Sequence, residues 1–294
     1  MASKPQPSGV TEPDEWVRGT FDRETIRAAL VDGGGAGVNA HDRPNVMWKI
    51  KRLVEGDPVS QFGLTGVNTL PFEEVLGLIA DAAGIDPDPS IRHGLVIVDP
   101  DKVIDALEVA GDRLAEAAAL GERVLIATGH PAGLPLLYQA VGSLLIESGA
   151  KLIRPLEGHT WNDDEGRRRQ IRYFRGMATL TDRASPIHTH GSEAMERMLE
   201  DQTPDLVFAD HGFAGAAIEA GIDTVSIADV NDPALVVADE PTAELDTAAA
   251  ERVLVAMEEL AASGVGFVIS SHDPRVMAIA DGFIRLQQGR VVEA

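Results

Sequence analysis

DLVFADHGFAGAAIEAGIDTVSIADVNDPALVVADEPTAELD, residues 205–246, contains three short apolar runs, each closed by an acidic residue. The runs span residues 206–209, 224–228 and 235–238, and the acids are Asp210, Asp229 and Asp239. Such runs, without polar alternation, are typical of strands buried on both faces of a parallel sheet. The carboxyl ends of parallel strands share one edge, which is where ligands bind in open α/β sheets. This stretch therefore predicts an α/β fold with its functional site at that edge.

Composition excludes several classes of protein. The chain has 294 residues and a net charge of -22, which argues against a general nucleic-acid binder or membrane-surface binder, because both need a basic face. It has no cysteine, which excludes disulfides, thiolate metal sites and cysteine nucleophiles. No apolar run approaches the roughly 20 residues of a membrane span. We expect a cytoplasmic protein with a disordered tail over residues 1–18.

Residues 19–120 are predicted to form a mainly helical cap. Helices are expected over residues 21–31, 44–55, 71–83 and 100–120. Asp22 would cap the first helix, and prolines occupy the first turn of the later ones. The second helix carries an uncommon basic patch of Lys49, Lys51 and Arg52. The glycine run 33–37 tempts a phosphate-loop interpretation, but no strand precedes it and no Gly-Lys-Ser/Thr closes it, which favours a linker.

Residues 121–236 are predicted to form the α/β core. It would begin with a strand at 123–127, a helix over 134–146 and a strand at 151–155. Between the first strand and the helix lies the turn Thr128-Gly129-His130. Such a turn at a helix N-terminus offers free N–H groups to an anion, so Thr128 and Gly129 are candidate substrate-binding residues. His130 is a candidate proton donor; the alternative is that it only hydrogen-bonds within the loop.

The basic run 167–175 is unusual in so acidic a chain. Its simplest interpretation is a solvated charged surface, and the alternative is phosphate recognition by Arg172 or Arg175.

His188 and His190 form a His-x-His motif that suggests metal binding. If this segment is extended, the two rings project from the same face. Imidazoles and carboxylates together suit a divalent metal ion, here Mg, Mn or Zn. We expect His188, His190, Asp210 and Asp229 to be the ligands. His211, or again His130, would protonate the leaving group, and Asp232 is a further catalytic candidate beside Asp229.

Several motifs in order resemble an actinobacterial family labelled simply phosphatase. They are FGLT (62–65), ATGHPAGL (127–134), QIRYFRGMATLTD (170–182), SPIHTH (185–190), DLVFADHGFAGAA (205–217) and SIADVNDPAL (226–235). The resemblance covers roughly residues 20–236 and implies hydrolysis of phosphate esters. The residue roles given above come from the chemistry of the side chains and not from the resemblance.

The last part of the chain, residues 237–294, is similar to the end of an ABC-transporter ATPase. LVVADEPTAELD (235–246) and GVGFVISSHDPRVMAIADGFIRLQQGRVVEA (264–294) carry this resemblance. It implies that Asp239 is the Walker B aspartate, Glu240 the catalytic base and His272 the switch histidine. No Gly-x-x-x-x-Gly-Lys-Ser/Thr and no LSGGQ-like motif occurs anywhere in the chain. These residues would then be inherited sequence without their original function.

The sequence predicts a mainly parallel, doubly wound α/β sheet with helices on both faces and a helical N-terminal cap. The ABC-like segment is expected to complete this sheet. The predicted function is a metal-dependent phosphatase that hydrolyses a small phosphate ester, with neither nucleic acid nor membrane insertion involved. Two alternatives stay open, a nucleotide-binding ABC-type fragment without a phosphate loop and a non-catalytic hybrid. A homodimer also stays open.

Overall fold

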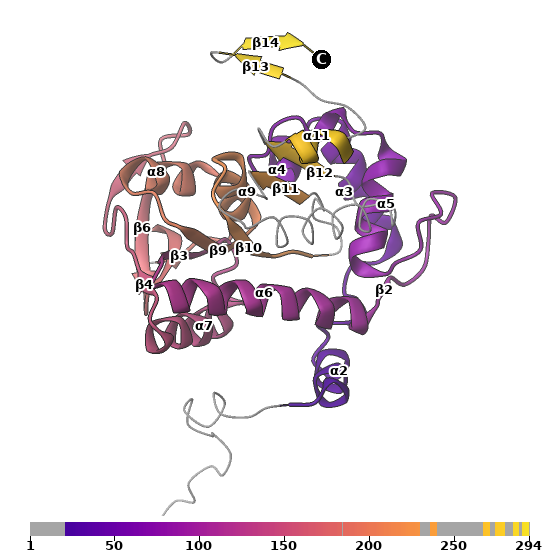
Figure 1. The fold of residues 1–294 in the computed structure, drawn as a ribbon, viewed down its shortest axis with the longest axis horizontal. Coiled ribbons are helices and arrows are strands. Elements are labelled where there is room, and N and C mark those ends of the chain that lie inside the picture. The colour runs from indigo at the N-terminus through magenta and orange to yellow at the C-terminus, as the bar shows by residue number, and fades with distance from the viewer. Residues whose placement is uncertain are drawn as a thin grey trace, which may run out of the picture.

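The computed structural model describes residues 21–183 and 185–229, and beyond them the short elements 236–239, 267–270, 274–279, 285–287 and 290–293. The predicted tail 1–18 lies outside the described residues. In chain order the elements form an N-terminal helical cap and then an α/β core (Figure 1).

The cap contains the four helices that the sequence predicts. Its elements are α2 (Arg23–Asp32), α3 (Arg43–Val54), α4 (Pro58–Gln61), the 3-10 helix η1 (Val67–Thr69), α5 (Phe72–Ala83), α6 (Pro100–Leu120), and the antiparallel strands β1 (Gly37–Val38) and β2 (Ile97–Val98). Asp22 caps α2 as expected, since its Oδ1 accepts a hydrogen bond of 2.7 Å from Thr25 N. Buried aliphatic residues of α3 and α5, among them Ile50 and Leu76, form a separate hydrophobic core for the cap.

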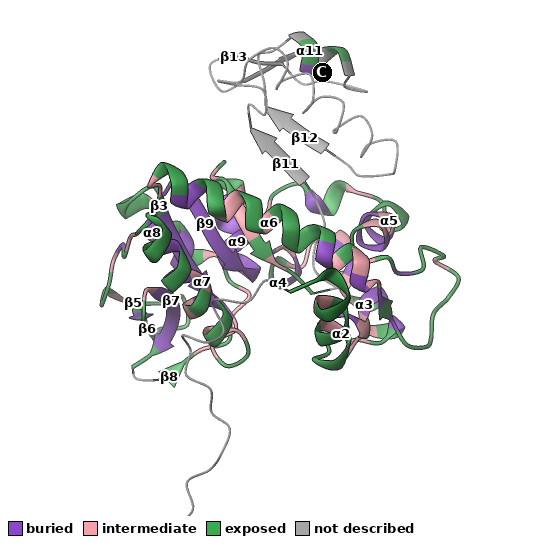
Figure 2. Cartoon of the chain, turned by 60° about the horizontal axis from the view of Figure 1, so that its bottom comes forward, coloured by how far each residue is buried: buried purple, intermediate pink, exposed green. Residues whose placement is uncertain are grey.

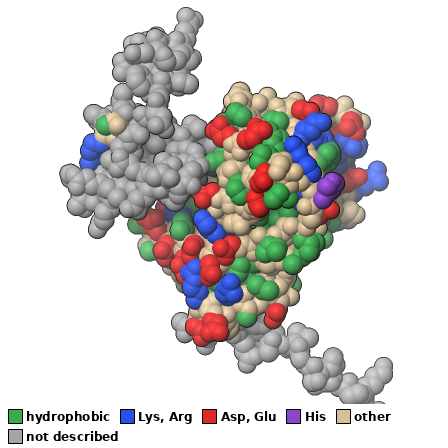
Figure 3. All heavy atoms as spheres, turned by 90° about the vertical axis from the view of Figure 1, so that its right-hand side faces the viewer, with side chains coloured by type: hydrophobic (Ala, Val, Ile, Leu, Met, Phe, Trp, Pro, Cys, Tyr) green, Lys and Arg blue, Asp and Glu red, His purple; other side chains and the backbone are tan. Residues whose placement is uncertain are grey.

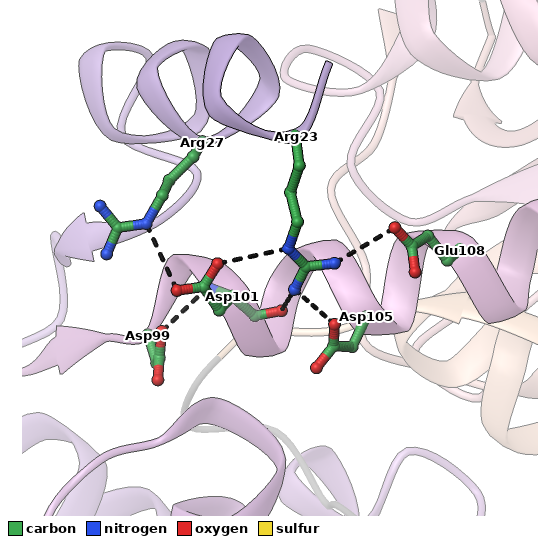
Figure 4. Close-up of polar contacts among 6 residues, drawn as sticks. All are labelled: Arg23, Arg27, Asp99, Asp101, Asp105 and Glu108. Carbon is green, nitrogen blue, oxygen red and sulfur yellow. Dashed lines mark hydrogen bonds and ion pairs between the residues drawn. The ribbon is translucent and has the colours of Figure 1, made fainter. Parts of the chain in front are cut away.

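Helix α2 is attached to α6 by ion pairs (Figure 4). Nη2 of Arg23 lies 2.5 Å from Oδ1 of Asp105, and its Nη1 lies 3.2 Å from Oε1 of Glu108. Arg27 adds a contact of 3.4 Å to Asp101. None of the residues of α2 is buried. These exposed pairs therefore contribute little to stability, and α2 is a peripheral element.

Helix α6 connects the cap to the core. It begins after Asp99, whose side chain accepts a hydrogen bond from Asp101 N, and ends at Gly121, whose φ of 68° suits glycine. Figure 1 shows it running along both the cap and the sheet. Ala117 and Ala118, near its end, pack against the sheet, while Arg113 pairs with Asp223 and Glu122.

The core is an eight-stranded sheet with the order β10-β9-β3-β7-β6-β5, with β4 paired to β3 and β8 paired to β7. Its strands are β3 (Arg123–Thr128), β4 (Lys151–Leu152), β5 (Thr160–Asn162), β6 (Arg168–Phe174), β7 (Met177–Asp182), β8 (Ser185–Pro186), β9 (Leu206–Asp210) and β10 (Thr224–Ile227). The neighbouring strands β10, β9, β3 and β7 are parallel, with β10 at one edge, and β6 and β5 form an antiparallel edge on the other side.

Helices cover both faces of the sheet, as predicted (Figure 2). They are α7 (Pro135–Ser148), α8 (Glu193–Asp201) and α9 (His211–Glu219), together with α6. Along β3, Val124 and Ile126 pack toward α6 and α7, whereas Leu125 and Ala127 pack toward α8 and α9. Because every second residue faces each helical layer, the strand has to be apolar throughout.

Two parts of the sheet differ from expectation. The predicted strand 151–155 is reduced to the two residues of β4. The basic run 167–175 forms the first strand and the start of the turn of a β-hairpin that the charge pattern concealed. Ile171 and Tyr173 are buried on one face of β6, and the turn between β6 and β7 has positive φ at Arg175 (49°) and Gly176 (90°). That alternation followed by Arg-Gly was the available signal for a hairpin.

The third apolar run forms a strand but not in the large sheet. β11 (Val236–Asp239) pairs in parallel with β12 (Phe267–Ser270) as a sheet of its own. The other described elements of this part are α11 (Pro274–Ile279) and the antiparallel pair β13 (Arg285–Gln287) and β14 (Arg290–Glu293). The apolar pattern identified the strand, but it carries no information about which neighbour the strand pairs with.

Two features of the described residues agree with the composition of the chain. In the view of Figure 3, acidic, basic and apolar side chains are interspersed over the described residues. Among the described residues, no helix combines the length and the apolar composition needed to cross a bilayer.

Cap and core meet where Phe62, which follows α4, packs on α9. A Cβ on Gly215 would lie 1.9 Å from the carbonyl oxygen of Phe62, so the two backbones are in direct contact. Nearby, Thr65 N donates a hydrogen bond of 2.9 Å to Oε2 of Glu219. Only glycine at position 215 permits the close approach of the Phe62 carbonyl oxygen.

We therefore expect Gly215→Ala to lower the free energy of unfolding by about 3 kcal/mol or more, because a backbone oxygen cannot move aside as a side chain can. Gly111→Ala is the matched control, since nothing lies within 4 Å of a Cβ added at that position in α6. It should raise stability by about 0.5–1 kcal/mol. Urea denaturation of both variants measures the effect, and an unchanged midpoint for Gly215→Ala would refute the contact.

Candidate functional site

Two strands of the large sheet end side by side at the site. β3 ends at Thr128 and β9 ends at Asp210, and the two strands are parallel neighbours with Ile126 opposite Phe208. Two residues further along this register, Thr128 is level with Asp210. The loop after β3 and the start of α9 therefore leave the sheet at the same point, as the sequence predicts for the carboxyl edge.

The carboxylate of Asp210 is the polar centre of this edge. Only 1% of the residue is exposed, and it accepts hydrogen bonds from Thr128 Oγ1 (2.5 Å), Gly129 N (2.7 Å) and Tyr138 OH (3.0 Å). Burial raises the pKa of Asp210, and the three donors oppose that rise. Its Oδ1 also lies 4.0 Å from Nδ1 of His130. Through these hydrogen bonds Asp210, at the end of β9, links β3 and α7, and its carboxylate lies behind His130.

Four histidines form a connected group of rings beside Asp210, and we call them the histidine cluster: His130, His188, His190 and His211. The ring of His130 stacks on His188 with centroids 4.4 Å apart. The centroid of His211 lies 4.0 Å from that of His130 and 4.1 Å from that of His190. The sequence paired only His188 with His190 as ligands. The fold brings all four together because β3, β8 and β9 deliver them to one edge.

The rings of His188, His190 and His211 are held in their neutral form. Burial, and then the neighbouring imidazoles, lower the pKa of His211 to about 3. Burial and the ammonium of Lys49 lower the pKa of His190 to about 4, and burial also lowers the pKa of His188. A neutral imidazole is the form that ligates metals. Near pH 7 a His211 with this pKa lacks the acidic proton of an imidazolium, which argues against its predicted role as general acid.

Three members of the cluster have the spacing of a metal site, and we call them the histidine trio: His130, His188 and His211. One ring nitrogen from each lies within 4.8 Å of the other two. Nδ1 of His130 and Nδ1 of His211 are buried and have no hydrogen-bond partner within the described part of the chain. Such orphaned groups are rare and need an explanation such as an ion. Three imidazoles with an open fourth position form one of the ligand sets of catalytic zinc.

Close backbone packing holds the trio in place. A Cβ on Gly129 would lie 2.3 Å from the carbonyl oxygen of Thr189, and one on Gly212 would lie 2.3 Å from that of His190. His211 itself has a left-handed φ of 47°, which is uncommon outside glycine. Gly129 is thus needed for contact with the His-x-His segment, and not for the approach of a phosphate that the sequence predicts there.

The predicted anion site at residues 128–130 does not form as expected. α7 begins at Pro135, so His130 lies in a loop ahead of the helix and not at its N-terminus. The N–H of Gly129 is bound to Asp210, and the N–H of His130 donates to Thr128 Oγ1 at 2.9 Å. Thr128 and Gly129 therefore hold the Asp210 carboxylate in place.

The cap contributes two residues that the sequence analysis did not assign to the site. Nζ of Lys49, on α3, lies 3.4 Å from Nδ1 of His190 and 5.0 Å from the centroid of the Phe62 ring. That ring in turn lies 5.1 Å from His211. Lys49 belongs to the basic patch and Phe62 begins the FGLT motif, but nothing in the chain order indicates that either reaches the sheet.

Asp210 and Asp229, both predicted metal ligands, lie outside the trio. Both oxygens of Asp210 accept hydrogen bonds. Oδ2 of Asp229 lies 3.5 Å from Nε2 of His41. The spacing of the acids after the strands indicated the right edge of the sheet but not which of them faces the histidines.

The two arginine candidates lie in different parts of the hairpin, Arg172 within β6 and Arg175 in the turn after it. Arg172 pairs with Thr179, which pairs with Thr128, so it is level with the site and two strands away, or about 10 Å. Arg175 lies in the turn before Met177, whose partner on β3 is Ile126. It is therefore at the opposite end of the strands from the site, contrary to the prediction.

The remaining candidates belong to the last part of the chain. Asp239 ends β11, outside the large sheet. Asp232, Glu240 and His272 lie outside the described residues.

Comparison with known proteins assigns the chain to a family. The chain belongs to the Phosphatase family, whose model matches residues 21–261. Phosphatase SCO2771 of Streptomyces coelicolor is 37% identical over 230 residues, which is 76% of this chain and 86% of that protein. No solved structure matches.

The comparisons also confirm the second resemblance as partial. The lipoprotein-releasing system ATP-binding protein LolD of Chromohalobacter salexigens is 48% identical over 65 residues, which is 22% of this chain and 27% of that protein. The macrolide export protein MacB of Rhodospirillum rubrum is 45% identical over 64 residues, only 10% of its length. The chain therefore shares a short segment with ABC ATPases and not their whole domain.

The bonds to Asp210 give a test that uses the two tyrosines of the chain. Tyr138→Phe removes a buried hydrogen bond to a carboxylate and should cost about 1.5–3 kcal/mol of unfolding free energy. Tyr173→Phe removes a bond to the neutral carbonyl of Pro155 and should cost about 0.5–1.5 kcal/mol. Chemical denaturation measures both. Equal losses would mean that the Asp210 network has no special weight.

Proposed function

We propose that this chain is a metal-dependent phosphatase that hydrolyses a small phosphate ester at the histidine trio. The observation that carries the proposal is the convergence of three ring nitrogens, two of them on rings with orphaned buried Nδ1 atoms, at the carboxyl edge of the sheet. Membership of the Phosphatase family supplies the reaction class.

Each residue of the site has a defined task in this proposal. His130, His188 and His211 would hold the ion, and the carboxylate of Asp210, whose Oδ1 lies 4.0 Å from Nδ1 of His130, places a negative charge behind that ring. The exposed position of His188 marks the side from which substrate enters. A divalent ion there supplies Lewis-acid polarisation of a phosphoryl oxygen and a water of lowered pKa. Arg172 is level with the site and would approach the phosphate from the hairpin.

The ligand type favours one metal among those expected from the sequence. Magnesium and manganese prefer carboxylate and carbonyl oxygens, whereas neutral imidazoles suit zinc and other transition metals. We therefore infer that Zn²⁺ is the best of the three candidates. The predicted set with two carboxylates would have suited Mg²⁺ or Mn²⁺ better.

The trio is tested by His188→Ala with His93→Ala as the matched control. His93 is an exposed histidine in the loop before β2. We expect His188→Ala to lower bound zinc, measured by elemental analysis after dialysis, by at least tenfold. Its hydrolysis of a panel of phosphate esters should fall in parallel, while its circular-dichroism spectrum stays unchanged.

His93→Ala should keep the metal content and the activity of the parent protein. Zinc retained at parental stoichiometry by His188→Ala would overturn the ligand assignment. Full phosphatase activity in metal-free protein would overturn the metal dependence.

A further inference from the structure

The basic patch on α3 has one member that points into the site. Lys51 pairs with Glu55 at 3.6 Å, and Arg52 pairs with Asp57 at 2.6 Å, both within the cap. Lys49 instead reaches across to the core, with its Nζ 3.4 Å from Nδ1 of His190.

The side chain of Lys49 is held in this direction by the cap. Helix α3 buries Val46, Ile50 and Leu53 in the cap core, and this packing fixes which face of the helix is turned toward His190. The ammonium lies 5.0 Å from the ring centroid of Phe62, within the range of a cation–π contact. A charged group is thus placed beside the histidine cluster by two separate packing contacts.

The charges of the site then favour an anion. An ammonium and a divalent cation repel each other, and the single carboxylate of Asp210 beside His130 offsets only part of three positive charges. A phosphoryl group placed between them is attracted to both charges, and its oxygens can accept a charge-assisted hydrogen bond from Lys49. The charge of Lys49 should therefore lower the affinity of the site for the metal ion alone. It should raise the affinity for the metal ion when phosphate binds with it.

We propose that Lys49 binds a non-bridging oxygen of the phosphoryl group at the histidine trio, and so couples phosphate binding to metal binding. This inference rests on the proposed metal-dependent phosphatase and adds to it the residue that recognises the phosphate. It also gives the cap a function, because the phosphate would be held between a cap helix and metal ligands from the sheet.

The test measures zinc affinity with and without inorganic phosphate, by competition with a chromogenic chelator. The parent protein is compared with Lys49→Met, with Lys49→Arg and with the control Lys51→Met. Phosphate should strengthen zinc binding by about tenfold or more in the parent protein and in the control. The enhancement should fall below about twofold in Lys49→Met and return in part with Lys49→Arg.

The same measurement distinguishes binding from a structural role. If Lys49 binds phosphate, Lys49→Met keeps or raises the affinity for zinc alone, because a repelling charge has gone. A loss of affinity for zinc alone would show that Lys49 only supports the fold of the site, and would overturn the inference. So would an equal phosphate enhancement in Lys49→Met and the parent. Failure of the parent protein to bind zinc at all would instead refute the proposed function.

Discussion

The buried carboxylate of Asp210 is the constraint on which the site depends. A carboxylate that is 1% exposed needs hydrogen-bond donors, and the fold provides them from Thr128, Gly129 and Tyr138. Satisfying it aligns the ends of β3 and β9 and packs α7 on the same face. The residues that leave those strand ends, His130 and His211, are then placed in contact. One electrostatic requirement in the core thus determines the geometry of the surface above it.

Glycines then allow three backbones to converge on that point. Gly129 and Gly212 let the chain pass within contact distance of residues 189–191, and Gly215 lets α9 meet Phe62 of the cap. Through this last contact the cap places Lys49 beside His190. The site therefore belongs to both parts of the molecule, with candidate metal ligands from the sheet and the candidate phosphate ligand from a cap helix.

The sequence predicted most of the elements that depend on local pattern. Apolar runs identified β3, β9 and β10, caps and prolines identified α2, α3, α5 and α6, and the placement of Asp210 at the carboxyl edge followed from the sheet rule. Contacts between distant segments were not encoded locally. The pairing of β11 with β12, the approach of Lys49 and the use of Thr128 to bind Asp210 all depend on tertiary packing. In β6 the many arginines suggested an exposed charged surface and concealed the buried Ile171 and Tyr173. A strand is indicated by the alternation of buried and exposed residues and not by the overall charge of the segment.

The central claim is that the histidine trio holds a divalent ion, and zinc K-edge X-ray absorption of the zinc-loaded full chain tests it most directly. The account predicts a first shell with about three imidazole nitrogens at ~2.0–2.1 Å, with the outer-shell scattering of the rings, and an oxygen ligand from solvent or phosphate. A first shell composed of oxygen alone, or a single imidazole, would contradict it.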